Sequence, residues 1–160
     1  MIRVLFPGSF DPPTNGHMNI IHRIANIFDK VEIVISINVQ KSYLFQPEER
    51  FEMMSTLVEG YENVRVHLWD KLIVDFAEKV GANVIIRGVR ALGDFPHEFE
   101  LSMINRGLHN KIETLLIPTD PKYFVLRTSS IKEMVMFGGD VSSMVPAIVE
   151  KALRDRLNGL

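Results

Sequence analysis

The chain has 160 residues, of which 46% are hydrophobic and 24% charged, and its net charge is −2. These values indicate one globular domain with a sizeable core. The charge argues against a nucleic-acid partner, although a local basic pocket is compatible with it. No apolar run approaches the roughly 18 residues that a membrane span needs, so no membrane partner is expected. Met1-Ile2-Arg3 leads directly into an expected strand, so no signal peptide is expected either. The absence of cysteine excludes disulfides and thiolate metal ligands and favours a cytoplasmic location.

Strand-like and helix-like segments alternate along the chain. Short apolar or β-branched runs predict strands at residues 2–6, 31–37, 64–68, 84–86 and 114–117. Helical spacing and helix-terminal signals predict helices at residues 16–28, 47–58, 72–80, 98–108, 130–137 and 146–157. This alternation predicts an α/β fold with a single domain over residues 1–160: a Rossmann-like open parallel sheet of about five strands with helices on both faces. In such sheets ligands bind beyond the carboxyl ends of the strands.

The loop after the first expected strand, PGSFDPPTNGH at residues 7–17, contains the first candidate site. Gly8 and Gly16 would let the backbone approach a ligand closely or adopt unusual dihedral angles. The helix that begins near Gly16 offers free N–H groups and a positive dipole end, which favours a bound phosphate. Ser9 and His17 would add a hydroxyl and an imidazole donor. The segment matches neither a Walker loop nor a G-x-G-x-x-G fingerprint. The alternative is a proline-stiffened turn with His17 as a surface capping residue.

Basic residues follow the second and fourth expected strands. Lys41 is a lone loop lysine of the kind that is usually solvated, but its place at a strand's carboxyl end favours a role in the site. The segment at residues 87–90, RGVR, places two guanidinium groups on either side of a glycine where a ligand should lie. A planar guanidinium suits phosphate oxygens, and the glycine allows a close backbone approach. The alternative is that both arginines form surface ion pairs with Asp94 and Glu98.

Other polar segments give weaker signals. Glu98 could orient a ribose, hold an arginine or simply favour the start of a helix. Thr128-Ser129-Ser130 precedes an expected helix, where hydroxyls could contact a nucleotide, although helix capping alone would explain them. The histidines show no zinc-binding spacing, and methionines such as Met103 and Met136 are expected to fill the core.

Together these residues resemble a known family. Thr14-Asn15-Gly16-His17 is similar to the (H/T)-x-G-H signature of the nucleotidyltransferase α/β superfamily. With Lys41, the IIRGVRA segment at residues 85–91 and Asn105-Arg106, the chain is more similar to bacterial phosphopantetheine adenylyltransferases over nearly its whole length. The resemblance implies adenylyl transfer from ATP to 4′-phosphopantetheine, giving dephospho-coenzyme A and pyrophosphate, the penultimate step of coenzyme A biosynthesis. Because a phosphate nucleophile is already ionised near neutral pH, we expect direct in-line attack without a general base.

The resemblance also implies a role for each matching residue. His17, Lys41 and Arg90 would be catalytic, and Mg²⁺ would be held by substrate phosphates, with no metal ligand from the protein. The residues implied for ATP are Ser9, Phe10, His17, Gly88, Val89, Arg90 and Glu98, together with the stretch 123–129. Within that stretch the implied contacts are Tyr123, Arg127, Thr128 and Ser129. The residues implied for phosphopantetheine are Ser9, Lys41, Ile73 and Arg87. A homohexamer and feedback inhibition by coenzyme A are implied as well.

The chain departs from the family pattern at several positions. Ser42 replaces a second lysine, and His97 replaces a tyrosine expected near the adenine. Arg127, in place of serine, is the largest change and could alter the grip on the triphosphate. Two alternatives stay open: a nicotinamide-mononucleotide adenylyltransferase or a cytidylyltransferase with the same opening loop, and a non-catalytic nucleotide-binding module. The presence of Lys41 together with the RGVRA segment argues against the first. The intact His17, Lys41, Arg87 and Arg90 argue against the second.

Overall fold

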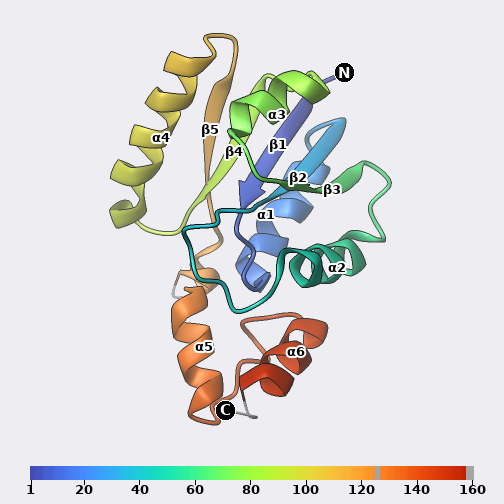
Figure 1. The fold of residues 1–160 in the computed structure, drawn as a ribbon, viewed down its shortest axis with the longest axis vertical. Coiled ribbons are helices and arrows are strands. Elements are labelled where there is room, and N and C mark those ends of the chain that lie inside the picture. Colours follow the sequence, from blue (N-terminus) through green and yellow to red (C-terminus); the bar gives the residue numbers. More distant parts are fainter. Residues whose placement is uncertain (125–126, 158–160) are drawn as a thin grey trace.

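A computed structural model describes residues 1–124 and 127–157. In chain order its elements are β1 (Arg3–Gly8), α1 (Asn15–Ala25), β2 (Lys30–Ser36), α2 (Pro47–Val58), β3 (Val64–Trp69), α3 (Ile73–Val80), β4 (Val84–Val89), η1 (Leu92–Asp94), α4 (Phe95–Leu108), β5 (Glu113–Pro118), η2 (Pro121–Tyr123), α5 (Thr128–Met136) and α6 (Ala147–Leu157). All strand pairs are parallel, and the sheet order is β3-β2-β1-β4-β5 (Figure 1). The predicted fold class is therefore confirmed.

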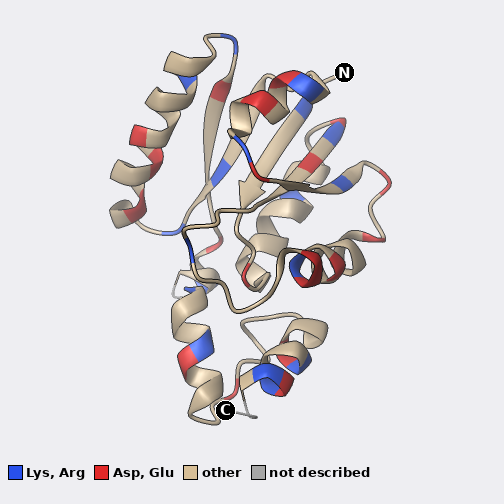
Figure 2. Cartoon of the chain, in the orientation of Figure 1, with Lys and Arg blue, Asp and Glu red and all other residues tan. Residues whose placement is uncertain are grey.

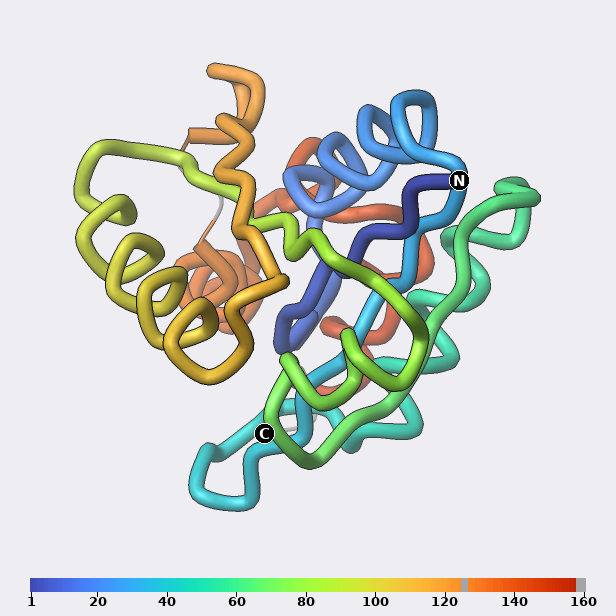
Figure 3. The backbone as a smooth tube through the Cα atoms, turned by 90° about the horizontal axis from the view of Figure 1, so that it is seen from above, coloured from blue at the N-terminus to red at the C-terminus, as the bar shows by residue number. Residues whose placement is uncertain are grey.

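Helices cover both faces of this sheet. Side chains alternate between the faces of a strand, so Val4 and Phe6 of β1 pack with α1 and α2, while Leu5 packs with α3. On the α1 face the buried isoleucines follow helical spacing, at Ile20 and Ile24. Figure 3 shows α1 and α3 on opposite sides of β1. This two-sided burial explains why the central strands are mostly apolar, although β2 also contains the buried Glu32.

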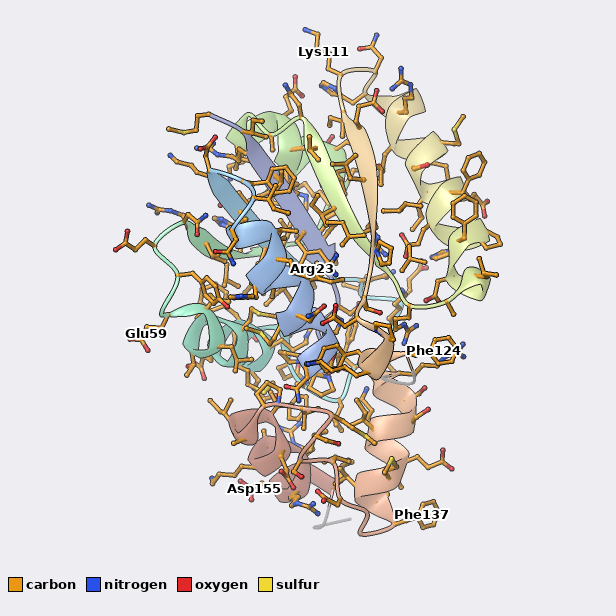
Figure 4. The ribbon with its side chains drawn as sticks, turned by 180° about the vertical axis from the view of Figure 1, so that it is seen from behind. Arg23, Glu59, Lys111, Phe124, Phe137 and Asp155 are labelled. Atoms are coloured by element: carbon orange, nitrogen blue, oxygen red, sulfur yellow. The ribbon has the colours of Figure 1, made fainter. Side chains whose placement is uncertain are left out.

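The last two helices lie beyond the carboxyl ends of the strands. Figure 1 shows α5 and α6 below the arrowhead of β1, and a third apolar cluster joins them to Phe45 and Met53. The end of this pair is exposed: Phe137 is 82% accessible and points into solvent (Figure 4). The expectation that the methionines fill the core is wrong for Met103 and Met136, which are 55% and 61% exposed.

Two strands continue at least two residues beyond the end that the sequence predicts. β4 extends through Val89 because residues 87–89 pair with residues 116–118 of β5. β1 includes Pro7 and Gly8, which pair with β2. Proline is tolerated there because β1 pairs with β4 only at Val4 and Leu5, so no β4 ladder continues beside Pro7. The arginine at position 87 therefore belongs to a strand rather than to a loop.

β1 and β4 separate toward their carboxyl ends. Their pairing stops at Leu5 and Ile85, whereas β1 stays paired with β2 through Gly8 and β4 with β5 through Val89. This separation is also where the strand order reverses, the position at which doubly wound sheets bind ligands. Helix α1 lies over it, and Arg23 of that helix donates to the Pro118 carbonyl oxygen at the end of β5 at 2.6 Å (Figure 4).

Charged residues of both signs are interspersed over the ribbon in the view of Figure 2, rather than gathered by sign. Within the described ranges, no helix has the length and apolar character needed to cross a membrane.

Candidate active site

A pocket of about 610 Å³ lies at the separation between β1 and β4. This volume falls in the range of roughly 300–1,000 Å³ that is typical of small-molecule sites. The pocket wall comes from the end of β1, the start of α1, the end of β4 with the segment into α4, and from Thr119, Tyr123 and residues 127–129. The site residues expected from the sequence that line it are Ser9, Phe10, His17, Arg87, Gly88, Arg90, Glu98, Tyr123, Arg127, Thr128 and Ser129.

Three expected site residues lie outside this wall. Val89 is the last residue of β4 and pairs with Pro118. Lys41 is exposed on the loop after β2, and Ile73 begins α3 and packs against the apolar cluster of Leu5 and Val74. Lys41 and Ile73 follow β2 and β3, which lie on the far side of β1 from β4. Of the stretch 123–129 implied for ATP, residues 125 and 126 lie outside the described residues.

His17 is fixed at the first turn of α1 by Thr14. The Thr14 N–H donates to His17 Nδ1 at 3.0 Å, and the His17 N–H donates to the Thr14 hydroxyl at 3.3 Å, which together form a capping box. Burial, together with the positive charges of Arg90 and Arg87, lowers the pKa of His17 to about 4. The imidazole is therefore neutral near pH 7 and offers an Nε2–H donor. The capping alternative is correct in part, because His17 both caps the helix and lines the pocket.

In the turn that contains Ser9, the residue with an unusual backbone conformation is Phe10. Phe10 has φ of 47°, a region that non-glycine residues rarely adopt, whereas Gly8 and Gly16 are not among the positive-φ glycines. A Cβ at Gly8 would lie 3.0 Å from the Phe10 ring, so this glycine makes room for the aromatic side chain. The Phe10 ring in turn contacts the His17 ring edge-on, at 4.9 Å between centroids. The expectation of unusual dihedral angles at the glycines is thus wrong, and the strained residue is Phe10.

Gly88 also serves packing. A Cβ at this position would lie 2.5 Å from Cδ1 of Ile20, a buried residue of α1. The missing side chain therefore lets α1 approach the end of β4, which brings His17 close to the arginines. The sequence analysis expected a ligand to approach the backbone closely at Gly88. The structure shows a close approach there, but by the Ile20 side chain of α1.

Arg87 connects the two separated strands. Its Nη1 donates to the Pro7 carbonyl oxygen of β1 at 2.9 Å, and its Nε and Nη2 bind the two oxygens of Glu98 at 2.6 and 2.9 Å. This two-point geometry is the strongest form of an arginine–carboxylate pair. Glu98 is the only buried residue of α4, so the pair also anchors that helix. Arg87 does form the ion pair that the alternative predicted. The pair lies in the pocket wall, however, and not on the surface.

Arg90 pairs with Asp94, and their Nε and Oδ2 are 3.3 Å apart. Burial acts to raise the pKa of Asp94, but the Arg90 and Ala91 N–H groups and the Arg90 charge lower it overall. The two acidic residues of the pocket wall are thus each held by an arginine. The Arg127 backbone carbonyl oxygen accepts the Ile131 N–H, but its guanidinium has no hydrogen bond or ion pair to the described residues.

Sequence reasoning missed Thr119. Its backbone N–H donates to the Val89 carbonyl oxygen at 2.9 Å, and it lines the pocket directly after β5. Its Oγ1 is buried and has no hydrogen-bond partner among the described residues. A buried hydroxyl of this kind normally has a hydrogen-bond partner. Its position after the fifth strand is the signal that could have identified it.

The sequence matches a family model and close relatives. Residues 5–134 match the cytidylyltransferase-like family. The chain is 42% identical over 156 residues to the phosphopantetheine adenylyltransferase of Finegoldia magna, covering 98% of this chain and 96% of the relative. It is 43% identical over 157 residues to that of Streptomyces coelicolor, with 98% of each chain covered. The chain belongs to the phosphopantetheine adenylyltransferase family.

Solved structures bear out the fold of this phosphopantetheine adenylyltransferase family member. A protein of Vibrio parahaemolyticus assigned as a nicotinate-nucleotide adenylyltransferase superposes with a TM-score of 0.70 over 98% of both chains. Its sequence identity is 16%, so this similarity concerns the fold alone. The family resemblance inferred from the opening loop and the RGVRA segment is confirmed.

Proposed function

We propose that this pocket transfers the adenylyl group of ATP to 4′-phosphopantetheine, giving dephospho-coenzyme A and pyrophosphate. The observation that carries this assignment is the 42–43% identity to phosphopantetheine adenylyltransferases over 98% of the chain. The geometry fits it, because the opening loop and the RGVRA segment meet in one wall. The fold neighbour's nicotinate-nucleotide chemistry is less favoured at its 16% identity.

The chemical step needs no general base. A phosphate oxygen of 4′-phosphopantetheine is already ionised near neutral pH, and it attacks the α-phosphorus of ATP in line. The new O–P bond forms as the bond from the α-phosphorus to the bridging oxygen breaks, and that oxygen leaves on pyrophosphate. Since Nδ1 of His17 is occupied by the Thr14 N–H, the ring contributes a hydrogen-bond donor rather than a base. Catalysis then rests on positioning and on stabilising negative charge.

The pocket residues divide into two sets for this reaction. His17 and Arg90 supply donors to the α-phosphate and its leaving group, and Thr119, Thr128 and Ser129 supply hydroxyls to ATP. The remaining ATP contacts are those implied by the resemblance, at Ser9, Phe10, Gly88, Val89, Glu98 and Tyr123. Arg127 adds a positive charge, with no ion-pair partner among the described residues, that would bind phosphate.

The acceptor phosphate would lie between the pocket wall and the loop after β2. Lys41 and Arg87 bind the phosphate of 4′-phosphopantetheine, with Ser9 between the substrates, and Ile73 borders the pantetheine arm. Arg87 is already oriented by Glu98 and the Pro7 carbonyl oxygen.

The side chains of the pocket are also compatible with Mg²⁺ that is held by the phosphate oxygens of the substrates. Asp94 and Glu98 are each engaged by an arginine, so phosphate oxygens are the hard anionic ligands left for the ion. Within the described residues, no group of three histidine or acidic side chains is placed to hold a metal. When bound, Mg²⁺ would neutralise charge on the triphosphate.

The deciding experiment is pyrophosphate release from purified protein with ATP, Mg²⁺ and 4′-phosphopantetheine, omitting each in turn. Release that needs all three supports the reaction and the role of Mg²⁺. Thermal-shift measurements with ATP, CTP, 4′-phosphopantetheine and nicotinamide mononucleotide form the control, because only cognate ligands stabilise the fold appreciably. Stabilisation by CTP or nicotinamide mononucleotide instead would indicate one of the rival transferases. ATP binding without turnover would indicate a non-catalytic module.

We further propose that the chain acts in the cytoplasm as a homohexamer inhibited by coenzyme A. The apolar face of α4 supports self-association: Phe95, Phe99 and Met103 recur every four residues and are 48%, 51% and 55% exposed. Coenzyme A contains the whole of the product dephospho-coenzyme A, which supports its binding to the same pocket. Light scattering tests the assembly, and inhibition of pyrophosphate release by coenzyme A tests the regulation.

A further inference from the structure

The carboxylate of Asp11 joins three segments that are distant in sequence. Its Oδ1 accepts the Phe45 N–H and its Oδ2 accepts the Leu44 N–H, both at 2.9 Å. The same Oδ2 accepts a hydrogen bond from Lys132 Nζ of α5 at 2.8 Å. The Asp11 side chain is only 7% exposed, so these bonds compensate the cost of burying its charge.

Each joined segment carries residues that we assign to a substrate. Asp11 directly follows Phe10 and Ser9 of the pocket wall. Leu44 lies three residues after Lys41, on the loop assigned to the acceptor. Lys132 lies four residues after Thr128, so the two share one face of α5, and holding Lys132 fixes the rotation of the helix turn that lines the pocket.

The turn at Asp11 needs such support from its surroundings. Phe10 holds a strained positive φ, which persists only where neighbouring contacts enforce it. On its other side Arg50, which is fully buried, donates from Nη1 to the carbonyl oxygens of Ser9 at 2.7 Å and Ser36 at 3.2 Å. The Arg50 bonds tie the turn to the end of β2. Asp11 ties it to the Lys41 loop and to α5.

We propose that Asp11, through Lys132, is a positioning residue that sets the ATP-binding turn of α5 and the acceptor loop against the Ser9–Phe10 turn. It lies outside the pocket wall and acts on the substrates through these segments. The inference rests on the proposed assignment of the two substrates to those segments. The proposal predicts that loss of the Lys132 contact weakens the binding of ATP alone. Loss of the Asp11 carboxylate should weaken the binding of both substrates.

The test compares Lys132→Met, Lys132→Arg, Asp11→Asn and a surface control. Lys132→Met should raise KM for ATP about ten-fold and change KM for 4′-phosphopantetheine less than about two-fold. Lys132→Arg should restore the ATP value, because the guanidinium can reach the same carboxylate oxygen. Asp11→Asn should raise both KM values. Lys151→Met is the control, since Lys151 forms an exposed pair with Asp155 on α6 and should change neither.

Two results for the Lys132→Met protein would overturn the proposal. A Lys132→Met protein with a lower melting temperature but unchanged KM values would assign the pair a purely structural role and overturn the proposal. Equal increases in both KM values for Lys132→Met would also overturn it, because the division of effects would be absent. Should Asp11→Asn fail to fold, the two Lys132 variants decide. Should the wild-type protein release no pyrophosphate, the proposed function fails, and titration calorimetry of ATP with wild-type and Lys132→Met protein still tests the α5 contact.

Discussion

The backbone N–H of Thr14 donates to Nδ1 of His17, and the two atoms are 3.0 Å apart. Because a backbone N–H can only donate, Nδ1 has no proton, and the neutral ring carries its proton on Nε2. Thr14 is almost fully buried, so this contact is shielded from solvent. The capping box of α1 thus also selects the tautomer of the proposed catalytic histidine, and it makes His17 a neutral donor near physiological pH.

Replacing His17 by alanine should leave the protein folded and lower kcat by about 10²–10³, the usual cost of losing one charge-stabilising donor. His17→Gln should recover part of the loss, because the glutamine amide places an N–H near the position of Nε2. Steady-state pyrophosphate release measures both. Near-wild-type kcat in His17→Ala would exclude His17 from the mechanism.

His17 should also make the folded state sensitive to acid. Its pKa is about 4 in the folded protein against an ordinary value of 6.5, so below pH 6.5 the unfolded chain binds a proton that the folded chain resists. This contribution to stability is present above pH 6.5 and is lost as the pH falls toward 4. Urea unfolding from pH 7.5 to 4 should show wild type losing more stability than His17→Gln, which cannot titrate there. Parallel profiles for the two proteins would contradict the lowered pKa.

Gly88→Ala should destabilise the protein by about 1–3 kcal/mol, the usual cost of overpacking, because the added Cβ would overlap Cδ1 of Ile20. Ile20→Val removes that Cδ1, so Gly88→Ala should cost clearly less in the Ile20→Val background. A double-mutant cycle by thermal unfolding measures this coupling. An additive result would show that Ile20 is not the group that requires glycine at position 88.

The apolar face of α4 should control assembly. Phe95 and Phe99 stack at 5.8 Å between ring centroids while half-exposed, which is typical of a surface that a partner covers. Phe99→Lys combined with Met103→Glu should convert the proposed hexamer to smaller species in light scattering. Ile27→Lys is the matched control, because Ile27 is an apolar residue that is 69% exposed outside this face. A double variant with unchanged mass would place the interface elsewhere.

The fold class followed from local patterns that tertiary contacts did not alter. The buried strand β1 has the apolar run Val4-Leu5-Phe6, and the run in β2 is interrupted only by Glu32. Helix α3 ends at Gly81 in the left-handed conformation that glycine favours. The (H/T)-x-G-H and RGVRA segments were likewise local, and they sufficed to indicate the family. Element ends were less predictable: β4 runs to Val89 because β5 pairs with it there, and no residue in β4 encodes that pairing.

The chain's own sequence therefore determined the order of its elements, the family and most of the residues around the pocket, because each depends on neighbours in sequence. Only the tertiary structure decided how those residues are paired. It joined Arg87 to Glu98 and to the Pro7 carbonyl oxygen, joined Asp11 to Lys132, and left Lys41 exposed beyond the pocket wall. The reason is physical: hydrogen bonds between residues far apart in sequence depend on how the strands separate and the helices pack, and these distances arise only when the whole sheet is assembled.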